Sequence, residues 1–175
     1  AVSGAGYPGV ASLDALGNVI PFIGGEEEKI EEETRKILGS FGNEQVIGGG
    51  MTISAHTNRV AVIDGHLEVV SLGFRRRVTP AEAVCALEAF RAPGDVAALP
   101  STPARPVEVD SRADRPQSRL DLDRGNGMTV TVGRVRPCNL LDLRLVLLSH
   151  NTIRGAAGAA IQNAELLVAR GYVGR

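Results

Sequence analysis

Apolar positions recur with a helical period in three parts of this chain. The first part begins at Glu26, where Glu and Lys or Arg residues three or four positions apart line a solvated face. Gly39 closes the segment. Its apolar stripe consists of Ile30, Ile37, Leu38 and Phe41. The pattern therefore predicts a helix that begins at Glu26 and ends near Gly39.

The second helical part carries its own start signal. Thr79 precedes Pro80 and stands three residues before Glu82, which is the pattern of a capping box with proline at the first helical position. The third part follows "SHN" and is the strongest helix pattern in the chain. Its first turns, "RGAAGAA", carry almost no side chains, which suits close approach by another backbone or a ligand. Its apolar stripe consists of Ile153, Ala156, Ala157, Ala160, Ile161, Ala164 and Val168.

Other segments have the composition and period of strands. Some are apolar on both faces and others alternate, and a phase change at Gly133 indicates a bulge. The predicted strands are residues 51–57, 59–63, 66–74, 128–136 and 141–149.

The remaining segments are read as connections. Residues 1–10 form a loop, and residues 12–20 form a short helix or an irregular link. Residues 92–127, rich in Pro, Arg and Asp, form a long excursion with one strand near 106–109. An excursion of this length usually has a function or lies across a partner. The order of elements predicts a mixed α/β fold.

Composition narrows the class of protein. A chain of 175 residues with 43% hydrophobic residues forms one domain, or a domain and part of another. A net charge of −1 argues against a nucleic-acid partner, and no apolar run reaches the roughly 20 residues of a membrane span. Two cysteines cannot form a disulfide framework, which favours the cytoplasm. The chain opens on "AVSGAGYPGV", a glycine-rich turn without a starting Met, so we expect that it is part of a longer protein.

The candidate functional residues are weak signals when each is taken alone. In "NRVAVIDGHLE", Arg59 and His66 stand seven residues apart, with an Asp-Gly turn between them. A histidine beside an aspartate is more often a satisfied polar residue, and a strand arginine often protects a sheet edge. The acidic run "EEEK" suits any helix N-terminus, and Asn151 suits a helix cap. His56 and His150 are read as structural, Cys85 and Cys138 as core residues, and no Cys or His pair has metal spacing.

Several blocks taken in order give a stronger signal. They include "AVSGAGYPGV", "NVIPFIGGEEEKIEEETRKILG", "ISAHTNRVAVIDGHLEVVS", "DRPQSRLD", "GMTVTVGRVR" and "LSHNTIRGAAGAAIQNAELL". In this order they resemble the C-terminal half of aspartate-semialdehyde dehydrogenases of the archaeal and fungal branch, over essentially the whole chain.

The resemblance implies a fold and a division into domains. It implies a mixed, largely antiparallel sheet covered by helices, of the type seen in the C-terminal domain of glyceraldehyde-3-phosphate dehydrogenase. Residues 1–148 would bind substrate and form the dimer interface. Residues 149–175 would form a helix that packs on an NADP-binding Rossmann domain outside this chain. A homodimer or homotetramer follows from the same resemblance.

The resemblance also implies a reaction and the residues that serve it. The family reduces L-aspartyl-4-phosphate to the semialdehyde with NADPH, through a cysteine thioacyl intermediate, and releases phosphate. His66 matches the general acid/base and Arg59 the residue that holds the substrate carboxylate. The remaining matches are Glu26 (or Glu27) for the substrate amino group, Lys29 for phosphate, and Ser3, Gly4 and Asn151 for the cofactor.

Two departures and two alternatives accompany this assignment. His56-Thr57 stands where relatives often have Gln-Cys, and neither cysteine of this chain sits in the motif of the nucleophile, which belongs upstream of Ala1. The chain alone is therefore expected to be inactive. One alternative is malonyl-coenzyme A reductase, which shares the scaffold, although Lys29 and Glu26 favour the aspartyl substrate. The other is a dimerisation module without catalytic function.

Overall fold

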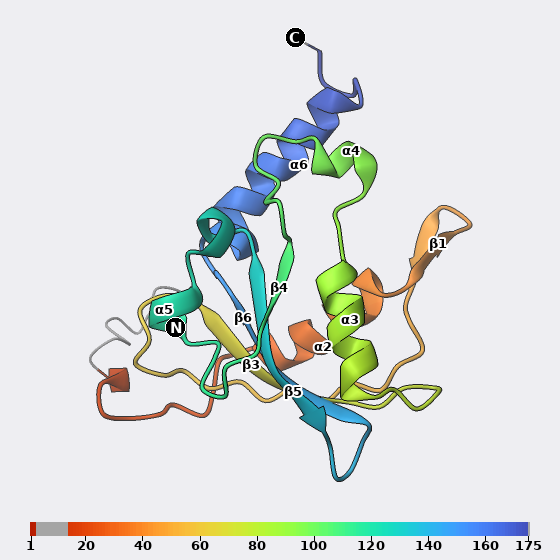
Figure 1. Ribbon diagram of the computed structural model, residues 1–175. Coiled ribbons are helices and arrows are strands. Elements are labelled where there is room, and N and C mark those ends of the chain that lie inside the picture. Colours follow the sequence, from red (N-terminus) through yellow and green to blue (C-terminus); the bar gives the residue numbers. More distant parts are fainter. Residues whose placement is uncertain (3–13, 175) are drawn as a thin grey trace. The chain divides into compact units, whose positions relative to one another are not determined.

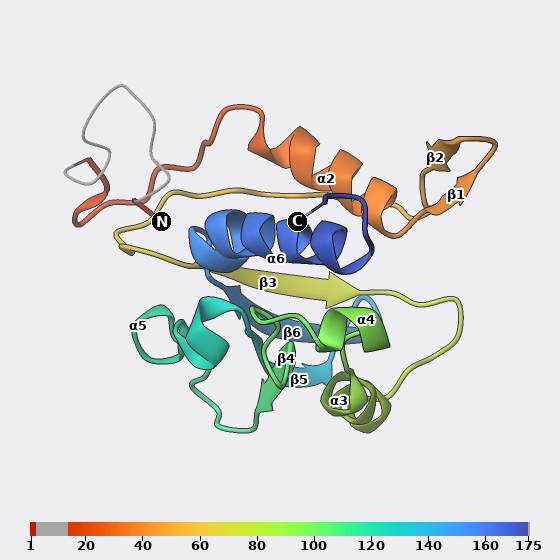
Figure 2. The ribbon, with the colours of Figure 1, turned by 90° about the horizontal axis from the view of Figure 1, so that it is seen from above.

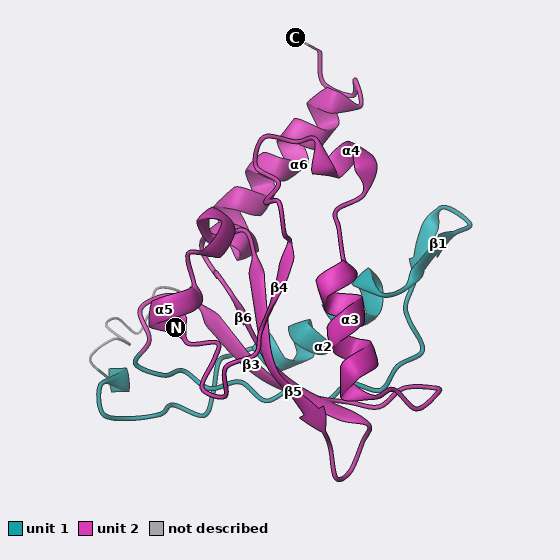
Figure 3. Cartoon of the chain, in the orientation of Figure 1, with its two compact units in different colours: residues 1–61 teal, residues 62–175 magenta. Residues whose placement is uncertain are grey.

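The chain divides into two compact units (Figure 3), residues 1–61 and residues 62–175. The structure is a computed structural model, which describes residues 1, 2 and 14–174. Each unit is described by itself. None of the helices in the described part of the chain is long and apolar enough to cross a membrane.

The first unit contains the predicted helix and a hairpin that the pattern did not predict. Helix α2 spans Glu26–Ile37, with three glutamates in its first turn and basic residues in its last, as the helix dipole favours. Strands β1 (Ser40–Gly42) and β2 (Gln45–Ile47) then pair antiparallel. Their turn, Asn43-Glu44, has positive φ at both residues, which matches the twist of a tight hairpin. Phe41 therefore lies on a strand and not on the helix stripe.

The strands predicted at 51–57 and 59–63 are absent from the first unit. Residues 51–57 run extended, but side chains one helical turn apart on α2 bind their backbone in place of a neighbouring strand. The bonds are Thr57 N to Glu27 Oε1 (2.7 Å), Ala55 N to Glu31 Oε1 (3.0 Å) and Arg35 Nε to Met51 O (3.3 Å). Beyond them, a single antiparallel bridge joins Arg59 to Ile20. The apolar pattern predicted strands here, but it did not indicate which partners the backbone would take.

The second unit is built on a four-stranded sheet (Figures 1 and 2). Its strands, in spatial order, are β3 (His66–Leu72), β6 (Leu143–Ser149), β5 (Val130–Pro137) and β4 (Val107–Asp110). Neighbours pair antiparallel except β4 and β5, which are parallel. The mixed, largely antiparallel sheet is thus confirmed. The predicted bulge is confirmed as well, because the register of β5 against β6 shifts between Gly133 and Arg136.

Helix α3 (Pro80–Ala89) contacts β4 and β5, and the buried core lies in the central strands of the sheet. The capping box is confirmed, because Thr79 Oγ1 accepts from Glu82 N and the Glu82 carboxylate accepts from Thr79 N. These bonds, first among them the one from the Thr79 backbone, lower the pKa of Glu82 to about 2. The main buried side chains are Met128, Val132, Leu143, Leu145, Val146 and Leu148.

The long excursion contains short helices and one strand. Helix α4 spans Gly94–Ala97, helix α5 spans Ser118–Asp121, and a 3₁₀ turn covers Arg124–Gly127. The strand expected near 106–109 is β4. In both views of the second unit α5 lies beside the start of β3 (Figures 1 and 2).

The C-terminal helix begins with a π-helical turn, Ile153–Ala157, and continues as α6, Gly158–Ala169. One side of α6 is tied to the loop after α4, through Glu165 to Ser101 (2.6 Å) and Gln162 to Thr102 (2.7 Å). A Cβ on Gly158 would stand 2.5 Å from Met128 Sδ, so the bare first turns accommodate this chain's own core. Other parts of the predicted stripe remain exposed, with Ile161 at 56% and Val168 at 48%.

Candidate functional site

The start of α2 presents the acidic and basic residues singled out in the sequence. Gly25, with φ of 72°, turns the chain into the helix. Glu27 is half-buried and binds the backbone of Thr57, so it has a structural partner. Its neighbour Glu26 is also half-buried, and Lys29 lies exposed one turn further on. A carboxylate and an ammonium group thus share the first turn of one helix.

Arg59 is held firmly at its backbone. Its N–H donates to Ile20 O at 2.8 Å, and its carbonyl accepts from Ile20 N at 3.0 Å. The half-buried guanidinium donates from Nη1 to the carbonyl of Ala1 at 3.1 Å. The backbone from which the Arg59 side chain extends is therefore fixed. A guanidinium held in this way can bind a carboxylate through two parallel bonds. Ser3 and Gly4, the other candidates near Ala1, lie outside the described residues.

His66 and Asn151 are brought to the same corner of the second unit. His66 is exposed and is the first residue of β3, paired with Ser149 at the end of β6. Asn151 follows β6, and its side-chain Oδ1 accepts the N–H of Gly65 at 2.7 Å. Two candidates separated by 85 positions in the sequence are therefore joined through the residue that precedes the histidine.

The two cysteines differ from the prediction that both are core residues. Cys85 is exposed on α3, and Cys138 is half-exposed in the turn between β5 and β6. Backbone N–H groups of Leu141 and Leu140 lower the pKa of the Cys138 thiol. Cys138 stands at the opposite end of β6 from His66, and seven strand residues span about 20 Å. His66 therefore cannot serve that thiol.

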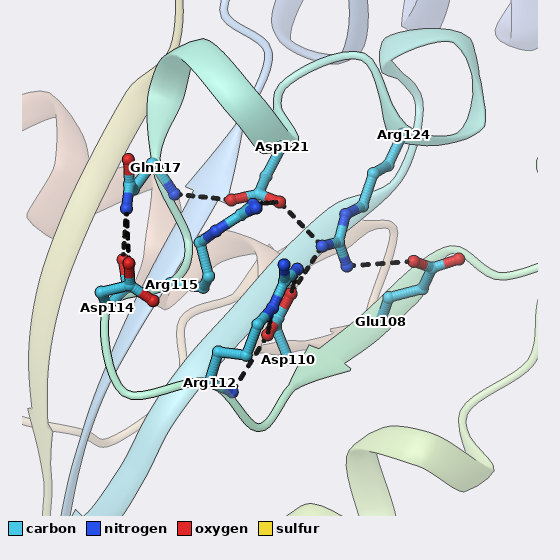
Figure 4. A network of polar contacts seen from close by, with 8 residues as sticks. All are labelled: Glu108, Asp110, Arg112, Asp114, Arg115, Gln117, Asp121 and Arg124. Carbon is cyan, nitrogen blue, oxygen red and sulfur yellow. Dashed lines mark hydrogen bonds and ion pairs between the residues drawn. The ribbon is translucent and has the colours of Figure 1, made fainter.

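An ionic cluster that sequence analysis did not identify lies in the excursion (Figure 4). Asp121, 2% exposed, binds Arg115 and Arg124, and its second oxygen accepts from Gln117 N at 2.7 Å. Arg124 also donates to Asp110 at 2.6 Å, and Asp110 binds Arg112. The signal available in the sequence was the alternation of Asp and Arg around "DRPQSRLDLDR". That pattern indicates pairing, but a solvated charge run has the same composition.

The arginines in this cluster outweigh the cost of burying the carboxylates. Hydrogen bonds from Arg112 and then Arg124 lower the pKa of Asp110. Burial alone raises the pKa of Asp121, but bonds from Arg115, Gln117 and Arg124 reverse it, so the net shift is downward. Both carboxylates are therefore ionised at neutral pH and fix the segment that contains α5.

The first unit offers the carboxylate of Glu26, the ammonium of Lys29 and the guanidinium of Arg59, and the second unit offers the imidazole of His66. Side chains of these kinds recognise small charged molecules. Among residues 1, 2 and 14–174, no three His, Cys, Asp or Glu side chains gather as metal ligands would. Side chains of these kinds suit binding and proton transfer.

A known protein family matches most of the chain. Residues 1–154 match the family described as semialdehyde dehydrogenase, dimerisation domain. An aspartate-semialdehyde dehydrogenase from Archaeoglobus fulgidus is 51% identical over 168 residues, which cover 96% of this chain and 48% of that protein. The chain thus spans about half the length of the curated relatives that it matches.

Solved structures agree with these matches. The crystal structure of aspartate semialdehyde dehydrogenase with NADP from Candida albicans superposes with a TM-score of 0.87 at 43% identity, over 95% of this chain and 48% of that one. Aspartate semialdehyde dehydrogenase II from Vibrio cholerae, complexed with ASA, gives a TM-score of 0.69 at 29% identity, over 89% and 42%. The fold of the chain is therefore that of half of these proteins.

Proposed function

Because this chain belongs to the semialdehyde dehydrogenase family, through its dimerisation domain, we propose that it is the substrate-binding half of an aspartate-semialdehyde dehydrogenase. The reaction would be the NADPH-dependent reductive dephosphorylation of L-aspartyl-4-phosphate to L-aspartate 4-semialdehyde, a step in lysine, threonine and methionine biosynthesis. The observation that carries the proposal is 51% identity to the Archaeoglobus fulgidus enzyme over 96% of the chain. The nucleophilic cysteine and the nucleotide-binding domain would lie outside these 175 residues, and we refer to the protein with both parts as the complete enzyme.

Each side chain has a role that its setting supports. His66 moves a proton to and from the reacting oxygen or thiol, since an imidazole titrates near neutral pH. Arg59 holds the substrate carboxylate, and Lys29 attracts phosphate. Glu26 binds the substrate amino group, because Glu27 is already engaged with Thr57.

The chemistry of the corner near Asn151 fits a nicotinamide cofactor. The half-buried amide of Asn151 combines a donor and an acceptor, which is what a carboxamide requires. Ser3 and Gly4 complete the proposed cofactor contacts from this chain. NADPH, when bound, supplies the hydride. A homodimer or homotetramer in the cytoplasm belongs to the same proposal.

The exposed stripe of α6 supports the division of 1–148 from 149–175. One side of α6 is fixed to its own unit, while Ile161 and Val168 are about half exposed. Burial of apolar surface is worth about 25 cal/mol per Å2, so this stripe favours a covering domain. We propose that the nucleotide-binding domain covers it.

We expect this chain alone to show no NADP reduction with aspartate semialdehyde and phosphate, because Cys138 lies far from His66 and Cys85 is exposed on α3 outside the motif of the nucleophile. Mixing it with the part of the Archaeoglobus fulgidus relative that it does not match should slow amide hydrogen exchange at Ile161 and Val168. Gln162 and Glu165, already fixed on the other side of α6, serve as internal controls in the same mass-spectrometric experiment. Turnover by the 175 residues alone would contradict the proposal.

Arg59→Lys in the complete enzyme should raise the KM for aspartate semialdehyde by about tenfold or more. Lysine keeps the charge but loses the planar, two-pronged geometry. Steady-state kinetics with NADP as the second varied substrate gives the control, since the KM for NADP should stay unchanged. Arg77→Lys, at an exposed loop position, is the matched variant and should leave both constants as they are. Equal loss of affinity for both substrates would indicate a folding defect instead.

Two other functions remain as alternatives with distinct signatures. A malonyl-coenzyme A reductase would use the same scaffold, but Glu26 and Lys29 match an amino group and a phosphate. A dimerisation module without catalysis would explain the family description but gives no role to an exposed His66 beside Asn151.

A further inference from the structure

The strand that contains His66 gives little support to the position of this residue. It is the first residue of β3, and β3 is an edge strand, paired only with β6 among the described strands. His66 and Ser149 form the last pair of that ladder. Strand ends fray unless other contacts hold them. The peptide that enters the strand therefore helps to set where His66 begins, together with the contacts that the histidine itself makes.

That entering peptide, at Gly65, is held from more than one side. Its N–H donates to Asn151 Oδ1 at 2.7 Å, and its φ of 102° lies in the region that favours glycine. A Cβ at this position would stand 2.8 Å from Leu122 Cδ1 and 3.2 Å from Leu148 Cδ1. Leu122 follows Asp121, whose carboxylate is fixed by the ionic cluster (Figure 4). The glycine is thus packed against a rigid segment and pinned by one amide side chain.

Asn151 is itself well supported. The preceding His150 is buried, its carbonyl accepts Gly155 N at 2.9 Å, and its ring lies 3.2 Å from Thr152 Oγ1. The helix that follows has Thr152 at its N-cap position with no side-chain cap bond. Asn151 stands directly before Thr152, and its side-chain oxygen reaches Gly65, 86 positions away.

We infer that Asn151 is a positioning residue for His66, because its side-chain oxygen fixes the Gly65 peptide from which the histidine projects. This role goes beyond a contact with the cofactor and rests on the proposed acid/base function of His66. A displacement of about 1 Å in a catalytic group costs on the order of 10²-fold in rate. The loss of one supporting bond should therefore appear in turnover.

The test is a double-mutant cycle in the complete enzyme with Asn151→Ala and His66→Ala. Asn151→Ala alone should lower kcat by about 10- to 100-fold. In the His66→Ala background the same change should cost less than about threefold, because the group that it positions is already gone. A full loss in that background would show that Asn151 acts independently of His66, and would overturn the inference.

The conservative variant separates positioning from cofactor binding. Asn151→Asp keeps an oxygen that accepts the Gly65 N–H but removes the amide donor. Both variants should therefore raise the KM for NADP, but the loss in kcat should be several-fold smaller in Asn151→Asp than in Asn151→Ala. If both variants lower kcat alike, Asn151 serves the cofactor and not the histidine. Asn163→Ala, an exposed asparagine of α6, is the matched control.

Amide exchange at Gly65 gives a readout that does not depend on activity. Exchange should accelerate in Asn151→Ala and stay slow in Asn151→Asp and Asn163→Ala. Unchanged exchange in Asn151→Ala would overturn the inference even if turnover fell. If His66→Ala proves fully active while Gly65 exchange responds as expected, the acid/base assignment fails and the supporting bond stands.

Discussion

Replacement of His66 by Ala in the complete enzyme should lower kcat by about 10²- to 10⁴-fold, which is the usual contribution of a positioned acid or base. The KM for aspartate semialdehyde should change much less, since the proposed substrate ligands Arg59, Glu26 and Lys29 are unchanged. A loss confined to kcat indicates an interaction made in the transition state.

His56→Ala provides the matched control for this change. His56 is exposed on the extended segment that α2 holds, and its removal should leave kcat within a few-fold. Stopped-flow and steady-state measurements of NADP reduction give both constants. If the His66 variant keeps kcat within a factor of a few, the histidine is not the acid/base.

Asp121→Asn should destabilise the chain by about 3 kcal/mol, near the lower end for removal of one partner from a buried ion pair. One carboxylate oxygen faces Arg115 and Arg124, and the other accepts from Gln117 N. The amide that replaces the carboxylate must therefore point its N–H group at a donor, either at the arginines or at Gln117 N. We expect a loss of stability near the lower end of this range because 24% of the Arg124 side chain is exposed.

Urea unfolding followed by circular dichroism measures this loss. Asp123→Asn, two residues on and exposed, is the matched control and should change stability by less than about 0.5 kcal/mol. A loss below 1 kcal/mol for Asp121→Asn would show that the cluster is not a stabilising network.

The same cluster sets the direction of a pH effect. The pKa values of Asp110 and Asp121 are lowered in the folded chain, so the stability they give is present above the unfolded value, roughly 3.9, and is lost as pH falls through the folded values. The parent should thus lose stability below about pH 4 more steeply than Asp121→Asn does.

The elements that local signals define were predictable from the sequence. The capping box around Thr79 and Glu82 and the bulge after Gly133 depend on residues close in the chain, and both occur as expected. Residues 51–57 show the limit of such signals. Their N–H groups bind Glu27 and Glu31 across 24 to 30 positions, and no local pattern states which partner an extended backbone takes.

The candidate site likewise combines features that the local sequence predicts with contacts between distant residues that it does not predict. The position of His66 at the start of a strand after an Asp-Gly turn follows from its immediate sequence. The bond from Gly65 to Asn151 and the burial of Asp121 arise only when β3, β6 and α5 assemble. The charges near Asp121 looked like a solvated run because composition alone does not reveal which carboxylate is enclosed.

The central claim is that this chain positions an aspartyl substrate for phosphate-dependent chemistry, and the most direct measurement compares substrates in the complete enzyme. The rate of NADP reduction is measured with aspartate semialdehyde in the presence and absence of phosphate, and NADPH oxidation is measured with malonyl-coenzyme A. We predict turnover that requires both aspartate semialdehyde and phosphate, with malonyl-coenzyme A at least 100-fold poorer in kcat/KM, on the order of 2.7 kcal/mol in transition-state binding. Comparable or faster turnover of malonyl-coenzyme A, or oxidation of the semialdehyde that is indifferent to phosphate, would contradict the account.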